Sequence, residues 1–172
     1  MAARKPASLA RWRRQAMRRM QASRDEMLRL VARLPEAEVL RPRTQDAWSI
    51  KDVLAHLLAG DEETLRRFQL VARGQADRIQ WFDLAYAHRF NARAVARGRR
   101  LGVKAMLGRM KRARARLIAG FRRLPEAALR DPAHDYTVVS WLPAPGWSHE
   151  REHAREIREW WRAQRGARTR SR

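Results

Sequence analysis

Cysteine is absent from this 172-residue chain. Its absence excludes disulfides, thiolate nucleophiles and cysteine-based metal sites, so any bound metal must take histidine or carboxylate ligands. Long apolar runs are missing too. No uninterrupted stretch approaches the roughly 18 residues that a membrane span needs, and the mean hydropathy is −0.70. The basic N-terminus is not followed by an apolar segment, so no secretory signal is expected. We therefore expect a cytoplasmic protein without membrane insertion.

Acidic residues are scarce relative to basic ones, with 18 Asp and Glu against 39 Lys and Arg, and the formal net charge is +21. Arginine carries most of that charge, since lysine occurs only at Lys5, Lys51, Lys104 and Lys111. Such a charge attracts nucleic acid or anionic membranes nonspecifically. The basic residues are spread through every segment, however, and are not interleaved with exposed aromatics as a base-stacking surface requires. Two interpretations stay open: solvated helix faces, or a surface that binds nucleic acid.

Apolar residues recur in steps of three and four along four long segments, which predicts an all-α fold. The predicted long helices are 9–34, 50–73, 103–123 and 149–164, with a shorter helix near 83–97. Ser8, Ser49 and Ser148 each suit a helix N-cap, and Asp52 completes a capping box with Ser49. The sequence thus predicts one domain over residues 8–165, with basic flexible tails at 1–7 and 166–172.

A short motif recurs after the first and the third long helix. Leu-Pro-Glu-Ala at 34–37 returns at 124–127, and each copy is followed, after a loop, by Trp-Ser at a helix start, Trp48-Ser49 and Trp147-Ser148. Each of these helices carries histidine on the side expected to face the core. The repeat predicts two similar halves whose histidine-bearing helices meet at the centre of the bundle.

Three histidines are candidate metal ligands. His149 and His153 are four residues apart, which places them on one face of a helix. His56 lies on the apolar side of the second long helix, one turn before Gly60, where the lack of a side chain leaves room for a ligand. An ordinary core histidine is the alternative for His56. Neutral imidazoles suit Zn, Ni, Cu or Fe(II), and three of them leave a coordination position for water or substrate.

The stretch 149–153 also matches H-E-x-x-H, in which the glutamate acts as general base. Glu150 lies about 100° around the helix from His149, and only 19 residues follow His153, where such enzymes usually place a third ligand. The alternative for Glu150 is an acid that favours the helix dipole. Glu150 and Asp61 are the acids to test for proton transfer, and no catalytic residue is assigned.

Two motifs resemble those of a known family. Residues 48–57, Trp-Ser-Ile-Lys-Asp-Val-Leu-Ala-His-Leu, resemble the second-helix motif of the DinB/YfiT-like superfamily. Residues 146–153, Gly-Trp-Ser-His-Glu-Arg-Glu-His, resemble its fourth-helix motif. The Leu-Pro-Glu-Ala junctions and the aromatic segment between them are similar to its ClbS/DfsB-type branch. The resemblance covers about residues 8–165.

The resemblance implies a four-helix bundle of up-down-down-up topology. It implies a divalent metal, with Zn²⁺ or Ni²⁺ expected, held by His56, His149 and His153. It further implies a metal-dependent thiol transferase, isomerase or hydrolase that acts on a small reactive molecule in detoxification or stress response, with a low-molecular-weight thiol as a candidate cosubstrate. The contrasting hypothesis is a non-catalytic module whose Arg-rich surface binds nucleic acid around a structural metal. Nonspecific nucleic-acid binding is expected only at low salt, and a homodimer stays open.

Overall fold

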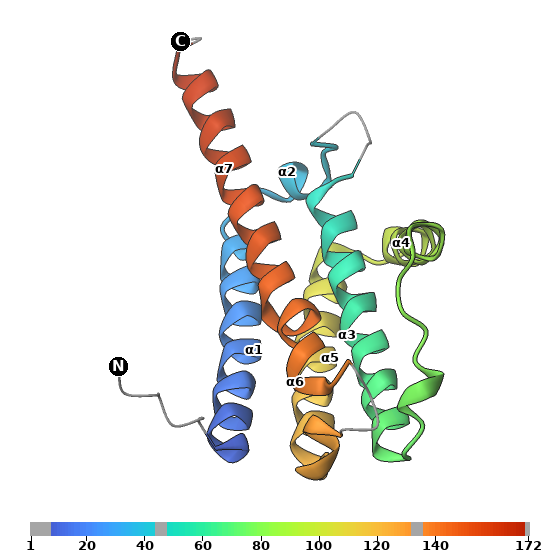
Figure 1. Cartoon of the computed structure of the whole chain (residues 1–172). Helices are drawn as coiled ribbons and strands as arrows, with labels where there is room; N and C mark the ends of the chain where they lie inside the picture. The colour runs from blue at the N-terminus through green and yellow to red at the C-terminus, as the bar shows by residue number, and fades with distance from the viewer. Residues whose placement is uncertain (1–7, 44–47, 132–135, 171–172) are drawn as a thin grey trace.

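The computed structural model describes residues 8–43, 48–131 and 136–170. In these ranges every regular element is helical, and one isolated bridge joins Pro42 to Ser49 (Figure 1). The long helices are α1 (Leu9–Ala32), α3 (Ile50–Ala72), α5 (Val103–Arg123) and α7 (His149–Arg170). Shorter elements connect them: α2 (Glu36–Leu40), α4 (Leu84–Arg99), α6 (Val138–Trp141), and 3₁₀ turns at Ala76–Arg78 and Ala127–Arg130. The predicted all-α class is confirmed, and none of the described helices is long and apolar enough to cross a membrane.

Side-chain caps set the starts of several helices. Ser8 Oγ accepts a hydrogen bond from Arg11 N at 3.2 Å, which begins α1 where the sequence predicts it. Ser49 and Asp52 form the predicted reciprocal capping box of α3. At the other end of α3, Gly74 has φ 67°, a left-handed conformation that glycine adopts without strain. Because caps and breakers are local signals, the predicted bounds of α1, α3 and α5 agree with the structure to within two residues.

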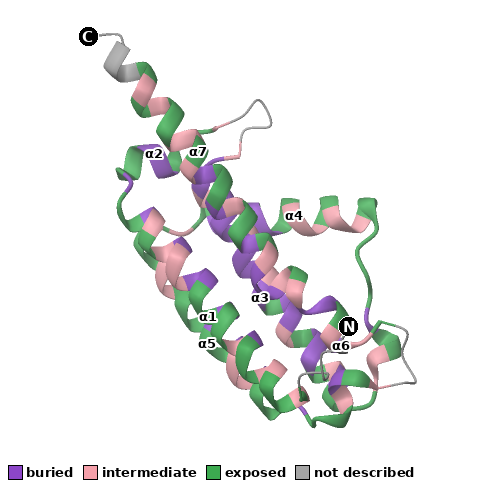
Figure 2. Cartoon of the chain, turned by 60° about the vertical axis from the view of Figure 1, so that its left-hand side comes forward, coloured by how far each residue is buried: buried purple, intermediate pink, exposed green. Residues whose placement is uncertain are grey.

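Helix α7 differs from its prediction at both ends. Ser148 does not cap it but lies in a π-helical turn, Ala144–Ser148, that continues directly into α7. The His149 N–H bonds to Ala144 O, five residues back, which makes this turn wider than an α-helical one. At its other end α7 continues past Gln164 to Arg170, so residues 166–170 of the predicted tail are helical. Figure 2 shows this end projecting beyond the other helices. The predicted tail 1–7 and the last residues, 171–172, lie outside the described residues.

The core lies between the inward faces of the four long helices, where the buried residues concentrate in Figure 2. It consists of two apolar clusters. One cluster is centred on Met27, Leu54, Met106, Met110 and Ile157. The other is centred on Met20, Phe68, Leu117, Phe121 and Trp141. The rings of Phe68 and Phe121 stack at 5.4 Å between centroids.

Between the two clusters lie four buried charged side chains, one from each long helix, which we call the ion quartet: Arg24 of α1, Asp61 of α3, Arg114 of α5 and Glu150 of α7. Each is no more than 2% exposed. Arg24 Nε lies 2.6 Å from Glu150 Oε1, and Arg114 forms a fork on Asp61 at 2.9 and 3.1 Å. Arg114 Nη2 also donates to Glu150 Oε2 at 2.9 Å. Two positive and two negative groups thus neutralise one another inside the bundle.

Helix α4 crosses α3 on the outside of the bundle (Figure 1). The crossing is close because Gly98 faces Ala55: a Cβ atom added at Gly98 would lie 2.2 Å from the Ala55 Cβ. This contact holds α4 against the half of α3 that carries His56 and brings Asn91 next to that histidine. The sequence predicts α4 but not its position.

Candidate metal site and adjoining pocket

The structure brings together the three histidines that the sequence predicts as a group. His56 comes from α3, and His149 and His153 come from adjacent turns of α7. The Nε2 atoms of His56 and His149 are 2.7 Å apart, and those of His149 and His153 are 3.2 Å apart. Candidate ligand atoms of all three lie within 4.8 Å of one another. In a tetrahedral zinc site, bonds of about 2.05 Å place neighbouring nitrogens about 3.3 Å apart. The 2.7 and 3.2 Å separations are close to this value, so these side chains could hold one metal ion.

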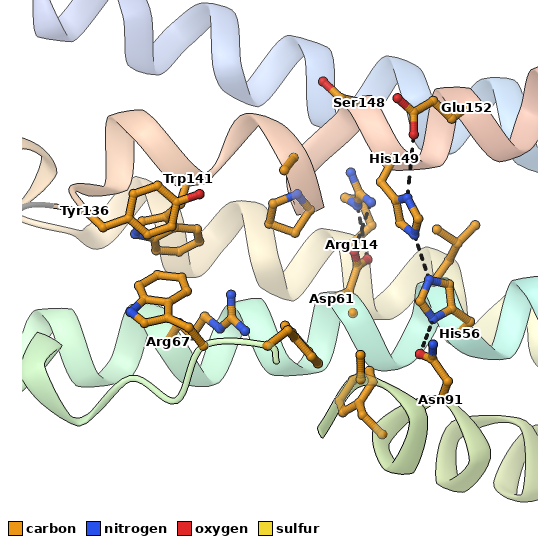
Figure 3. Close-up of a pocket in the computed structure, with 18 residues that line it drawn as sticks. His56, Asp61, Arg67, Asn91, Arg114, Tyr136, Trp141, Ser148, His149 and Glu152 are labelled. Atoms are coloured by element: carbon orange, nitrogen blue, oxygen red, sulfur yellow. Dashed lines mark hydrogen bonds and ion pairs between the residues drawn. The ribbon is translucent and has the colours of Figure 1, made fainter. Parts of the chain in front are cut away.

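The outer ring nitrogens of the three histidines face oxygen atoms. His56 Nδ1 lies 2.8 Å from Asn91 Oδ1, and His153 Nδ1 lies 3.0 Å from Glu156 Oε2 (Figure 3 draws the His56 pair). His149 Nδ1 has a more distant partner, Glu152 Oε2 at 3.8 Å. An oxygen acceptor at Nδ1 keeps the proton there and leaves the Nε2 lone pair free for a metal, the usual outer-shell arrangement of metal-binding histidines. Sequence analysis assigned no role to Asn91, because one asparagine on an Arg-rich helix carries no spacing signal.

The surroundings favour neutral imidazoles. Burial, followed by the charges of His149 and His153, lowers the pKa of His56 from 6.5 to about 4, against a smaller opposing effect of the Asn91 hydrogen bond. Burial and the neighbouring His153 also lower the pKa of His149. Neutral imidazole is the form that binds metal, so these two side chains are in the required form at neutral pH.

The two acids singled out from the sequence belong to the ion quartet. Both oxygens of Glu150 are engaged, because Arg24, Arg114 and Ser23 all donate to them. Asp61 is held by the guanidinium groups of Arg114 and Arg24. Both carboxylates therefore neutralise buried arginines inside the bundle. The glutamate of the H-E-x-x-H match thus binds Arg24, Arg114 and Ser23 in the bundle interior and is not among the residues that line the pocket described below.

The ion pairs of Glu150 also explain why the orientation of α7 differs from the predicted one. The sequence predicts His149 and His153 on the stripe that faces the core, but the buried residues of α7 are Glu150, Ala154 and Ile157. The histidines lie at the edge of the helix instead, with 45% of the His149 side chain and 16% of the His153 side chain exposed. Glu150 pairs with buried arginines, so it takes the core-facing position that the sequence predicts for His149, while Ile157 is buried as predicted. His149 faces a pocket beside the core.

That pocket has a volume of about 530 Å³ and two chemically different ends (Figure 3). One end contains His56, His149, Asn91 and Glu152. The other end contains Arg67 among aromatic side chains: Trp81, Phe82, Tyr136 and Trp141. Gly60 lies along the wall between them, and a Cβ atom added there would meet nothing within 4 Å. The room predicted beside His56 is therefore part of this pocket.

Comparison with known proteins gave one match. A family model described as the DinB superfamily matches residues 19–157, a span that holds His56, His149 and His153. No curated protein and no solved structure matches the chain. The narrower ClbS/DfsB-type assignment stays a prediction. The match covers most of the chain and includes both motifs that resemble the family in sequence, so this chain belongs to the DinB superfamily.

Proposed function

We propose that the chain binds one divalent metal ion through His56, His149 and His153 and uses it, as an enzyme, on a small reactive molecule. The observation that supports this most is the direction of the Nε2 atoms. With Nδ1 of His56 and His153 bound to oxygen acceptors, their Nε2 lone pairs share one small volume with that of His149. Nitrogens this close need a shared proton or a cation between them, and one divalent ion would satisfy all three at once. Three imidazoles suit Zn²⁺ or Ni²⁺.

An open coordination position supports a catalytic role over a structural one. Structural zinc sites are closed by four protein ligands, whereas catalytic sites hold the metal with three. Among the described residues the group contains three histidines, and two of them line the pocket. When bound, such a metal lowers the pKa of a coordinated water or thiol, which is the chemistry that hydrolysis and thiol transfer share. The aromatic walls of the pocket would hold an apolar substrate and exclude water.

We also infer the up-down-down-up order of the long helices and a role in detoxification or stress response. The helix order is supported by the crossing helix α4, which leads the chain from the end of α3 back to the start of α5 (Figure 1). The role is supported by the family membership and by a pocket of a size that suits a small molecule. The proposal also specifies Zn²⁺ as the metal, a thiol as the cosubstrate and the ClbS/DfsB-type branch as the subfamily.

Metal analysis of the full chain tests the proposal. The protein is stripped with a chelator and titrated with Zn²⁺, and then with Co²⁺, whose visible spectrum reports ligand number and type. We expect one ion per chain, and we expect a small thiol to change the Co²⁺ spectrum because it occupies the open position. His56→Ala, His149→Ala and His153→Ala should each weaken binding sharply while the helical circular dichroism stays unchanged.

His88→Ala is the matched control, since His88 is an exposed histidine of α4 outside the group. It should bind metal like the parent chain. Equal binding by all four variants would show that the metal sits elsewhere. A Co²⁺ spectrum that indicates a closed site and does not respond to thiol would leave the metal structural and overturn the enzymatic proposal.

A further inference from the structure

Arg67 occupies an unusual position at the aromatic end of the pocket. Its side chain is only 6% exposed, yet its Nη2 atom is buried without a hydrogen-bond partner. The guanidinium carbon lies 4.8 Å from the ring centre of Trp81 and 4.9 Å from that of Phe82. Aromatic rings attract a cation but accept none of its N–H groups as well as an oxygen atom does. A buried donor without an acceptor is costly, so this side chain is prepared for a group that the chain itself does not supply.

The charge of Arg67 is also not fully balanced. Its acidic neighbour Glu63 is shared with Arg66, which takes both carboxylate oxygens in a fork at 2.8 Å. Arg67 reaches only one of those oxygens, through Nε at 3.1 Å. One negative charge thus faces two positive ones. The other guanidinium in the pocket, that of Arg114, is saturated by Asp61, Glu150 and backbone carbonyls.

Arg67 and His56 lie on the same face of α3. Eleven residues correspond to about three helical turns, or roughly 16 Å along the axis. Gly60 lies between them and leaves the wall open. Figure 3 shows the same arrangement, with Arg67 beside Tyr136 and Trp141 at one end and His56 beside His149 at the other. The pocket therefore offers a cation at one end, apolar walls, and the histidines at the opposite end.

We propose that Arg67 forms an anion subsite, so that the substrates of this chain are elongated amphipathic carboxylates. The carboxylate binds the free N–H groups of Arg67, the apolar middle lies against the aromatic walls, and the reactive group points to His56, His149 and His153. Only the last of these contacts rests on the proposed function, because the anion subsite needs no metal. Trp81 and Phe82 are 37% and 43% exposed, so their rings can shift outward when the anion enters.

The test compares two probes that differ only in charge, phenylbutyrate and phenylbutanol, by calorimetry on the metal-free full chain. We expect phenylbutyrate to bind about tenfold more tightly or better, because bonds between ionised partners are the strong ones. Arg67→Gln should abolish that preference. Arg66→Gln is the matched control: it removes the same charge from the same acid, but Arg66 does not line the pocket and its side chain is 44% exposed.

The control separates the subsite from the general field of a chain with net charge +21. Equal loss in Arg66→Gln and Arg67→Gln, or no preference in the parent chain, would overturn the proposal. Because Arg67→Gln could misfold, a second test uses the side-chain resonances of the parent chain and needs no variant. The side-chain N–H resonances of Arg67 should shift with phenylbutyrate and not with phenylbutanol, and unchanged resonances would also overturn it.

A second arm links the subsite to the metal. ω-Mercaptoalkanoic acids of increasing length are titrated into the Co²⁺-loaded chain next to the corresponding mercaptoalcohols. The acids should gain affinity over the alcohols only above the length that joins the two ends, and the gain should vanish in Arg67→Gln. If no metal binds, the proposed function fails while the phenylbutyrate result stands. If metal binds but the acids gain nothing at any length, the subsite fails while the metal site stands.

Discussion

Asn91 of α4 and His56 of α3 are joined by a 2.8 Å contact between Asn91 Oδ1 and His56 Nδ1, although they lie 35 residues apart. Asn91→Ala removes the acceptor that keeps the proton on Nδ1 and leaves Nε2 free. Loss of such an outer contact costs about 10- to 100-fold in metal affinity. We expect this loss in Zn²⁺ titrations, with the helical content unchanged. Asn91→Asp keeps an acceptor at the same place and should bind Zn²⁺ at least as tightly as the parent chain.

Glu150 should matter for stability more than for proton transfer. Glu150→Gln leaves Arg24 and Arg114 without one buried partner, and breaking a buried pair costs about 3–5 kcal/mol. Urea unfolding should show this loss, whereas Glu152→Gln should change the free energy of unfolding by less than about 0.5 kcal/mol, as is usual for surface sites, because its side chain is 59% exposed. A Glu150→Gln chain of parental stability would mean that the ion quartet contributes little to folding.

Caps, breakers and apolar spacing are local, so the helices and the trio of histidines could be predicted. The ion quartet could not, because arginine serves equally on solvated faces and in buried pairs. A weak signal did exist: Ser23 and Arg24 interrupt the apolar stripe between Met20 and Met27, and Arg114 interrupts the stripe of α5. Such gaps at matching heights on two helices indicate a polar layer.

The anion subsite could not be predicted for the same reason, because arginine occurs both on solvated faces and in buried positions. Nothing in the sequence distinguishes Arg67 from Arg66, and only tertiary packing buries the first and exposes the second. The position of Asn91 depends on how closely α4 approaches α3 at Gly98, which is also a tertiary property.

Two glycines should respond to alanine in opposite ways. Gly98→Ala places a methyl group 2.2 Å from the Ala55 Cβ, so α4 must move away from α3. Overpacking of this kind costs about 1–3 kcal/mol, and the shift of Asn91 should weaken Zn²⁺ binding too. In Gly60→Ala the added methyl meets nothing within 4 Å, so the helix should gain about 0.5–1 kcal/mol. Thermal melts of the two variants would check both signs, and similar shifts in one direction would contradict the packing described.

Stability of the metal-free chain should fall in mild acid. The pKa of His56 is lowered from 6.5 to about 4, so between these pH values the unfolded chain takes up a proton that the folded chain does not. The folded state is therefore fully favoured above pH 6.5 and loses stability as the pH falls toward 4, by at most roughly 3–4 kcal/mol. Urea unfolding at several pH values in the presence of chelator measures the slope. His56→Gln should flatten it and His88→Gln should not.

Nucleic-acid binding should be weak and purely electrostatic. With a net charge of +21 the chain should bind a random DNA duplex at low salt. Such binding falls by about 10³–10⁵ between 50 and 200 mM salt when 6–10 phosphates are contacted. Fluorescence anisotropy across that range should show this steep loss for any sequence. Tight binding to one sequence at physiological salt would instead favour the nucleic-acid hypothesis.

The ion quartet also fixes the axial alignment of the four long helices. A helix that slid by one turn would carry its charged group about 5.4 Å out of the polar layer and into one of the apolar clusters, where an unpaired charge is costly. The axial alignment of α3 against α7 is therefore set by Asp61 and Glu150. These residues follow His56 by just over a turn and His149 by a single position, so the alignment that pairs the charges also places His56 opposite His149. Surface residues of these helices can be substituted without changing the alignment, but the helices cannot shift past one another without separating the histidines.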